Sequence, residues 1–253
     1  MSTSKTYFLS DLHLGAACHN NAIAHEQMIV QWLESIAPHA SAVYFLGDVI
    51  DYWFEYQTVV PRGYVRFLGQ IARMADSGIK IVWLKGNHDM WMTNYLSEHL
   101  GIEIIDGILD RTIDGKRFVL EHGDGMGEQS HGFKILRQLF RNPVARRLFA
   151  GIHPRWTVGL AHRWSAKSRS GGAIADSHQI TSSVDALAEA SQKYLQANPG
   201  VDYFIYGHLH VVGNRIIDSE TGARMILLGD WIDKFTYATY AADEGLITHQ
   251  FKP

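Results

Sequence analysis

Five short apolar runs along this chain are each followed within two residues by a polar string, and this alternation constrains the fold more than any other feature. The apolar runs, typical of buried strands, lie at residues 7–9, 42–46, 79–84, 117–120 and 203–206. Loops after the strands of an α/β fold gather at one edge of the sheet and carry reactive groups. The chain is therefore predicted to assemble one site from Asp11-Leu12-His13, Gly47-Asp48, Gly86-Asn87-His88-Asp89, Glu121-His122-Gly123-Asp124 and Gly207-His208-Leu209-His210.

The first and last strings each hold two polar residues separated by a leucine. Because side chains in a strand alternate between faces, Asp11 and His13 are expected to project the same way while Leu12 turns into the core. The same alternation is expected for His208 and His210. Both pairs are thus predicted to face one cleft.

The strings supply carboxylate, amide and imidazole groups and no thiolate. Such ligands suit Mn²⁺, Fe, Zn²⁺ or Co²⁺ rather than an iron–sulfur cluster or Ca²⁺. Any single string is more often a chance match or a turn, but five in order after strands favour a metal site. The remaining histidines are expected to be surface or core residues, namely His19, His25, His39, His99, His153, His178 and His249.

From Ser4 to about Phe251 the strings resemble those of the calcineurin-like metallophosphoesterase superfamily. Residues 47–54, 156–169 and 228–231 are similar to the branch that hydrolyses UDP-2,3-diacylglucosamine in lipid A biosynthesis. The resemblance implies an α/β sandwich of two mixed β-sheets flanked by helices. We expect one domain over residues 1–253, with a helical cap inserted at about residues 130–170.

The superfamily pattern implies two divalent transition-metal ions, for which we expect Mn²⁺. It assigns one ion to Asp11, His13, Asp48 and His210, and the other to Asp48, Asn87, His122 and His208, so that Asp48 bridges them. Two such ions, about 3.5–4 Å apart, lower the pKa of a shared water and neutralise charge on the phosphoryl group. The nucleophile is then expected to be a metal-bridging hydroxide.

His88 resembles the superfamily histidine that contacts the leaving oxygen, as a proton donor or as a charge stabiliser. Asp89 is expected to orient it and to favour the imidazolium form. Members of the diphosphatase branch often carry Arg at this position. Ser130 and Phe133 also stand where relatives often place an acidic residue and a Tyr at the substrate, so those two contacts are not carried over.

Residues 131–170 contain nine of the 23 Lys and Arg residues and no Asp or Glu, whereas the rest of the chain is acidic. An amphipathic basic helix is predicted up to Asn142-Pro143, and a second helical segment from about Pro154 to Ser165. A solvated helix pair packed on the sandwich would explain the composition alone. Its place after His122 favours instead a cap that meets a substrate with an anionic head and apolar tails, or an anionic membrane surface.

Substrate contacts are expected from Asn87 and His208 at the metal site and from Arg163, Lys167 and Arg169 in the cap, because cationic groups suit oxyanions. The resemblance implies hydrolysis of UDP-2,3-diacylglucosamine to UMP and 2,3-diacylglucosamine 1-phosphate. Three alternatives stay open: a phosphodiesterase for a soluble nucleotide or other phosphoester, a non-catalytic binding scaffold, and a nucleic-acid-processing enzyme, although no nucleic acid is expected as partner.

The scaffold is predicted from helical periodicity at residues 24–36, 65–75 and 182–196, and from strands at 214–217, 224–228 and 235–240. The aromatic residues 52–54 are expected to pack in the core rather than to line an acyl channel, and Asp230-Trp231 leaves the same choice open.

The N-terminus has no signal-peptide pattern, and no run of about 18 apolar residues occurs, so a cytoplasmic protein is expected, peripheral on the cytoplasmic face of the inner membrane. The single cysteine, Cys18, is expected to be an ordinary thiol, and the oligomeric state is left open.

Overall fold

The computed structural model describes residues 4–125, 139–154, 156, 159 and 177–253. Most of the expected cap lies outside this range, including the predicted substrate contacts Arg163, Lys167 and Arg169. The division into one domain with an inserted cap therefore stays a prediction.

Six strands form the first sheet, in the order β11-β10-β1-β2-β3-β4. The four strands β1 to β4 run parallel, and β10 and β11 add an antiparallel edge. Their bounds are β1 (Lys5–Leu9), β2 (Ala40–Leu46), β3 (Lys80–Leu84), β4 (Glu103–Ile105), β10 (Thr236–Ala241) and β11 (Gly245–Gln250).

Five strands form the second sheet, in the order β5-β6-β7-β9-β8. β6, β7 and β9 are parallel neighbours, while β5 and β8 pair antiparallel at the two edges. Their bounds are β5 (Leu109–Ile113), β6 (Lys116–Glu121), β7 (Tyr203–Tyr206), β8 (Val212–Ile216) and β9 (Arg224–Leu228).

The central strands are apolar throughout because both of their faces are buried. In β1, Phe8 packs between the two sheets against Tyr44 of β2 and Phe118 of β6. Its neighbours Tyr7 and Leu9 point the other way, toward the helices. Because alternate residues of the strand enter two different buried clusters, the apolar runs in the sequence are continuous rather than alternating.

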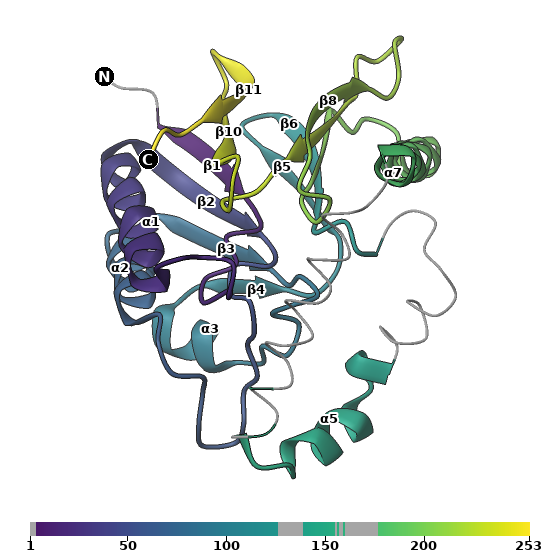
Figure 1. Cartoon of the computed structure of the whole chain (residues 1–253). Helices are drawn as coiled ribbons and strands as arrows, with labels where there is room; N and C mark the ends of the chain where they lie inside the picture. Colours follow the sequence, from purple (N-terminus) through teal and green to yellow (C-terminus); the bar gives the residue numbers. More distant parts are fainter. Residues whose placement is uncertain (1–3, 126–138, 155, 157–158, 160–176) are drawn as a thin grey trace.

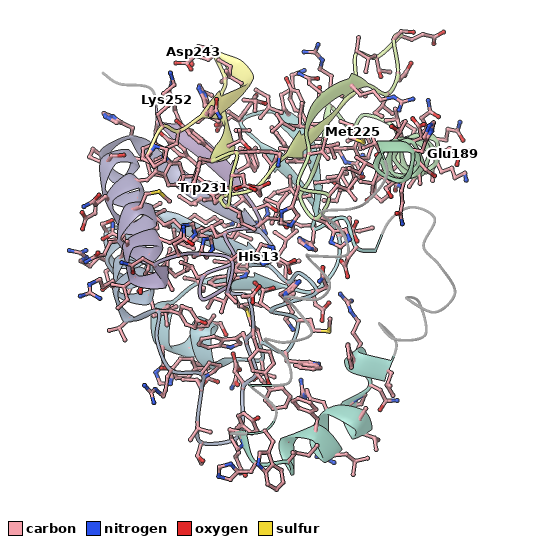
Figure 2. All side chains as sticks on the ribbon, viewed as in Figure 1. His13, Glu189, Met225, Trp231, Asp243 and Lys252 are labelled. Carbon is pink, nitrogen blue, oxygen red and sulfur yellow. The ribbon has the colours of Figure 1, made fainter. Side chains whose placement is uncertain are left out.

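Helices cover the outer face of each sheet (Figure 1). α1 (Ala22–Ile36), α2 (Val65–Asp76) and the short α3 (Tyr95–Leu100) lie on the first sheet, and α7 (Ser177–Ala197) lies on the second. Figure 2 shows the two sides of α7. Met225 of β9 lies in the core on its inner side, and Glu189 projects from its outer side. The result is the α/β sandwich of two mixed sheets expected from the sequence.

A further helix, α5 (Pro143–Ala150), lies apart from both sheets at the lower end of the view in Figure 1. In the sequence, Asn142-Pro143 predicts only the end of a helix. A helical stretch does end at Arg141, but the Asn142 side chain then caps α5 by accepting from the amides of Val144 and Ala145 at 2.8 and 3.2 Å. Pro143 is well suited to the first turn, where its missing N–H costs nothing.

The expected aromatic core residues are buried, with Tyr52, Trp53 and Phe54 exposing 5%, 0% and 1% of their surface. Phe54 packs against Trp91 and against Phe149 of α5, with ring centroids 5.2 and 5.1 Å apart. The prediction that this cluster packs as core is confirmed. No helix among the described residues is long and apolar enough to cross a membrane.

Candidate metal centre

Six of the seven expected ligands form two groups of three. Within each group, ligand atoms lie within 4.8 Å of one another. The groups also adjoin, since Asp48 Oδ2 is 3.3 Å from His122 Nε2 in its own group and 3.9 Å from His13 Nε2 in the other. Asp48 therefore occupies the position of a bridging carboxylate. The two groups are Asp11, His13 and His210, and Asp48, His122 and His208.

The direction of most of these side chains is set by positive backbone φ angles and not by the alternation of side chains along a strand. β1 ends at Leu9, and Asp11 and His13 both follow it with positive φ angles of 56° and 45°. Asp48 and His210 have φ angles of 52° each. The expectation that Asp11 and His13 face one way is confirmed, but the reason given for it is wrong, because the residues lie in a left-handed loop and not in a strand.

Two glycines permit the loops to approach one another closely. A Cβ at Gly86 would overlap the Asp48 carboxylate and would lie 2.5 Å from the Asp48 backbone nitrogen. A Cβ at Gly207 would overlap Ser10 and would lie 2.6 Å from Asp11 Oδ2. Neither contact is tolerable for a real Cβ, so any larger residue would push a carboxylate out of place.

In the first group, Asp11 Oδ1 is buried and forms no hydrogen bond within the described part of the chain. It lies 3.3 Å from His210 Nε2, which in turn is 3.3 Å from His13 Nε2. Three ligand atoms thus converge on one point. A buried carboxylate oxygen without a donor and two imidazole nitrogens facing each other fit a cation placed between them.

The charges of this group agree with that fit. Burial alone would raise the pKa of Asp11, but His210 and His13 outweigh it and hold the pKa well below its usual range. Burial would lower the pKa of His13 and of His210, yet the neighbouring carboxylates raise them to about 9 and about 10. The surrounding carboxylates thus favour positive charge at this point, as a divalent cation would supply.

In the second group, His122 Nε2 lies 3.1 Å from Asn87 Oδ1, which brings the seventh expected ligand to the centre. His122 Nδ1 donates to the Leu46 carbonyl at 2.7 Å, so the ring is fixed with Nε2 toward Asp48. Burial and the neighbouring His122 lower the pKa of His208 to about 4, and the neutral imidazole is the form that binds a metal. This donor set of oxygen and nitrogen also fits a transition-metal ion.

His88 lies beside this centre, and its orientation is set by Asp51. His88 Nδ1 donates to the Asp51 carbonyl at 3.0 Å, while His88 Nε2 is 3.9 Å from Asp48 Oδ2. Asp51 Oδ1 also accepts from His13 Nδ1 at 3.1 Å. Asp51 was not among the residues predicted for the site, although it is visible in the sequence as the second aspartate of the string 47–51.

Asp89, expected to orient His88, is placed elsewhere. Its carboxylate accepts from the Gly86 amide at 2.7 Å, the Val49 amide at 2.9 Å and Trp83 Nε1 at 3.1 Å. Burial and the nearby Asp48 raise the pKa of Asp89 to about 6. Asp89 thus ties the two loops to β3, and Asp51 occupies the position beside His88 that the sequence had suggested for Asp89.

A further carboxylate, Asp230, also faces the centre, with Oδ2 3.6 Å from His210 Nδ1. The sequence leaves open whether Asp230 and Trp231 pack in the core or line an acyl channel. The structure separates them, because the Trp231 side chain is fully buried in the core. Figure 2 shows Trp231 and His13 near the middle of the molecule, where the loops of the first sheet meet the turn after β9.

Comparisons with known proteins bear on this centre. The sequence pattern of the calcineurin-like phosphoesterase family matches residues 4–212. A UDP-2,3-diacylglucosamine hydrolase of Porphyromonas gingivalis is 40% identical over 248 residues, covering 94% of this chain and 94% of that protein. A protein of the same name from Nitrosococcus oceani is 28% identical, with 95% of this chain and 92% of that protein covered.

Among solved structures, an archaeal phosphodiesterase aligns with 98% of this chain and 99% of its own, at 14% identity and a TM-score of 0.49. The match to the family pattern spans residues 4–212, a range that contains all seven expected ligands. This chain is therefore a member of the calcineurin-like phosphoesterase family.

Proposed function

We propose that this protein hydrolyses the pyrophosphate bond of UDP-2,3-diacylglucosamine, a step of lipid A biosynthesis that releases UMP and 2,3-diacylglucosamine 1-phosphate. The observation that carries the reaction type is the pair of adjoining ligand groups around Asp48. The substrate is supported by the relatives of that name, which match this chain over nearly its whole length.

In this proposal two divalent ions, with Mn²⁺ as the expected metal, are held by the residues around Asp48. When bound, such ions supply a nucleophilic water and neutralise charge on the phosphoryl oxygens. Asn87 and His208 also face the substrate phosphate. The proposed ligands are Asp11, His13, Asp48, Asn87, His122, His208 and His210.

His88 acts on the leaving oxygen, as proton donor or charge stabiliser. Because Nδ1 is engaged by the Asp51 carbonyl, Nε2 is the nitrogen that faces the reaction. Two carboxylates lie near the ring, with Asp51 Oδ1 3.6 Å from Nδ1 and Asp48 Oδ2 3.9 Å from Nε2. Asp51 therefore positions His88.

The described part of the cap supports an amphiphilic substrate and a place at the cytoplasmic surface of the inner membrane. Val144 and Leu148, four residues apart on α5, are 63% and 71% exposed, and Trp156, beyond the end of the helix, is 71% exposed. Arg146 and Arg147 are also exposed on α5. Apolar side chains flanked by cations suit an anionic lipid surface. Arg163, Lys167 and Arg169 are proposed to bind the anionic head group.

The test is an assay of UMP release from UDP-2,3-diacylglucosamine in detergent, by metal-depleted protein with and without added Mn²⁺. A generic phosphodiester serves as parallel substrate. Asp48→Asn should abolish the metal-dependent release, whereas Asp76→Asn, which changes an exposed aspartate at the end of α2, should leave it unchanged. Turnover of the generic diester alone would contradict the lipid substrate, and equal release without metal would contradict the proposed centre.

A further inference from the structure

The turn that follows β9 holds one buried carboxylate in a fixed orientation. Asp230 is 1% exposed, and its Oδ1 accepts from the backbone amides of Ile232, Asp233 and Lys234 at 3.0, 2.8 and 3.1 Å. Three donors on one oxygen fix the carboxyl plane, because any rotation would leave partly buried amides without this acceptor. The turn therefore also sets the direction of the other oxygen, Oδ2.

Asp230 Oδ2 faces two cationic or proton-bearing groups. It lies 3.6 Å from His210 Nδ1 and 2.8 Å from Lys234 Nζ. On the opposite side of the same imidazole, His210 Nε2 lies 3.3 Å from Asp11 Oδ1. The His210 ring thus stands between a carboxylate of the proposed metal centre and a carboxylate that belongs to the turn.

The same turn also supports Asp11. The Trp231 amide donates to the Asp11 carbonyl at 3.0 Å. The Trp231 side chain is anchored in the core, with its ring centroid 4.6 Å from that of Trp32 in α1 and 5.9 Å from that of Phe251. One short segment therefore connects the core to two proposed ligands of the same ion.

We propose that Asp230 is a positioning residue for one metal ion, which fixes the His210 ring and makes it a stronger ligand, and that Lys234 moderates this effect. A carboxylate behind a ligating histidine raises the basicity of the ligand and holds its orientation. Lys234 neutralises part of that charge and places a cation near the metal, so it opposes metal binding. This inference rests on the proposed metal centre.

The effect should concern only one of the two ions. His122, in the other group, is fixed through Nδ1 by the neutral Leu46 carbonyl at 2.7 Å rather than by a carboxylate. Removal of the Asp230 charge should therefore weaken one binding event and spare the other. A purely structural role for the turn would instead lower stability and leave the two affinities in their original ratio.

The experiment is a calorimetric titration of Mn²⁺ into metal-depleted full-length protein, with the melting temperature of the metal-free protein as a second readout. Asp230→Asn keeps an oxygen for the three amides and removes the charge. One of the two dissociation constants should then rise about 10- to 100-fold while the other stays unchanged. Asp218→Asn is the matched control, since Asp218 also accepts from a turn amide, that of Glu220 at 3.0 Å, but does so at the surface.

Lys234→Met provides the opposite change without touching the acceptor of the turn. The dissociation constant of the same ion should fall, by less than the rise in Asp230→Asn because the Lys234 side chain is 39% exposed and partly screened. The inference would be overturned if Asp230→Asn bound both ions with wild-type affinity. If Asp230→Asn failed to fold, unchanged or weaker binding of the ion by Lys234→Met would overturn it instead. Wild-type protein that binds fewer than two ions would overturn the proposed centre itself.

Discussion

The ligand loops and helix α5 differ in how completely the rest of the molecule surrounds them. Asp11 and His122 expose 0% and 1% of their surface, whereas Leu148 of α5 exposes 71%. The loop after β1 is hydrogen-bonded to the loop after β2. The amides of Asp11 and His13 donate to the carbonyls of Gly47 and Asp48 at 3.1 and 2.9 Å. In the described structure α5 is held mainly through Phe149. Changes in the loops should therefore act through geometry, and changes on α5 through what binds there.

The largest expected effect is on the loop side, at His88. His88→Ala should lower kcat about 10²- to 10⁴-fold, which is the usual contribution of a positioned acid or base. Metal content should not change, because His88 is not a proposed ligand. Metal analysis and steady-state kinetics on one preparation check both statements, and an unaltered kcat would remove His88 from the mechanism.

A glycine pair tests whether the loops act through geometry. Gly86→Ala should lower kcat at least about 100-fold, because its Cβ would overlap the Asp48 carboxylate and displace it. Gly69→Ala is the matched control, since a Cβ at Gly69 in α2 meets nothing within 4 Å. The control should keep full activity and gain about 0.5–1 kcal/mol in unfolding free energy. Equal activity of the two variants would show that the loops tolerate displacement.

Neighbouring residues of α5 sharpen the other side of the comparison. Phe149→Ala should release α5 from the body, because its ring packs against Phe54 and Trp91 with centroids 5.1 and 5.0 Å apart. Each aromatic pair is worth about 0.5–1.5 kcal/mol beyond the buried area. Amide hydrogen exchange of α5 measures the loss as faster exchange. Leu148→Ala should leave the amide hydrogen exchange of α5 at the wild-type rate. Equal exchange rates in Phe149→Ala and Leu148→Ala would contradict the proposed role of the Phe149 contacts.

The smallest expected effect on the folded protein is at the exposed tip of α5. Leu148→Ser should change the unfolding free energy by less than about 0.5 kcal/mol, because the side chain touches little. Its binding to anionic lipid vesicles should nevertheless weaken, as measured by co-sedimentation. Ile247→Ser, on the exposed side of β11, should bind vesicles like the wild type. If both variants bound equally well, α5 would not be the surface that meets lipid.

Sequence patterns were sufficient where a segment is buried on both faces. β9 (Arg224–Leu228) was predicted with its observed bounds, and β2 was predicted to within two residues. The missed strands are those that lie at sheet edges, where apolar and polar residues mix. In β5 (Leu109–Ile113) partly buried and exposed positions alternate, and β4 has only three residues.

The site divides in a similar way. The ligands could be found because each follows a strand in a short local string. Asp51 and Asp230 could not be assigned their roles, since these depend on partners distant in sequence. Asp51 contacts His13, 38 residues away, and only the fold brings the two together. His25, by contrast, agrees with its expectation as a surface or core residue, since it is buried and its Nε2 donates to the Leu12 carbonyl at 3.0 Å.

The left-handed backbone of the ligand loops has a thermodynamic consequence. Five of the seven proposed ligands have positive φ angles, between 45° and 66°. For residues other than glycine this conformation costs about 1–2 kcal/mol each, so the centre forms against a local tendency to relax. An ion that binds only the formed centre adds stability in proportion to the logarithm of its concentration. The metal concentration would then set the free energy of unfolding of the protein as well as its catalytic activity. When metal is scarce, the ligand loops would unfold locally before the two sheets do.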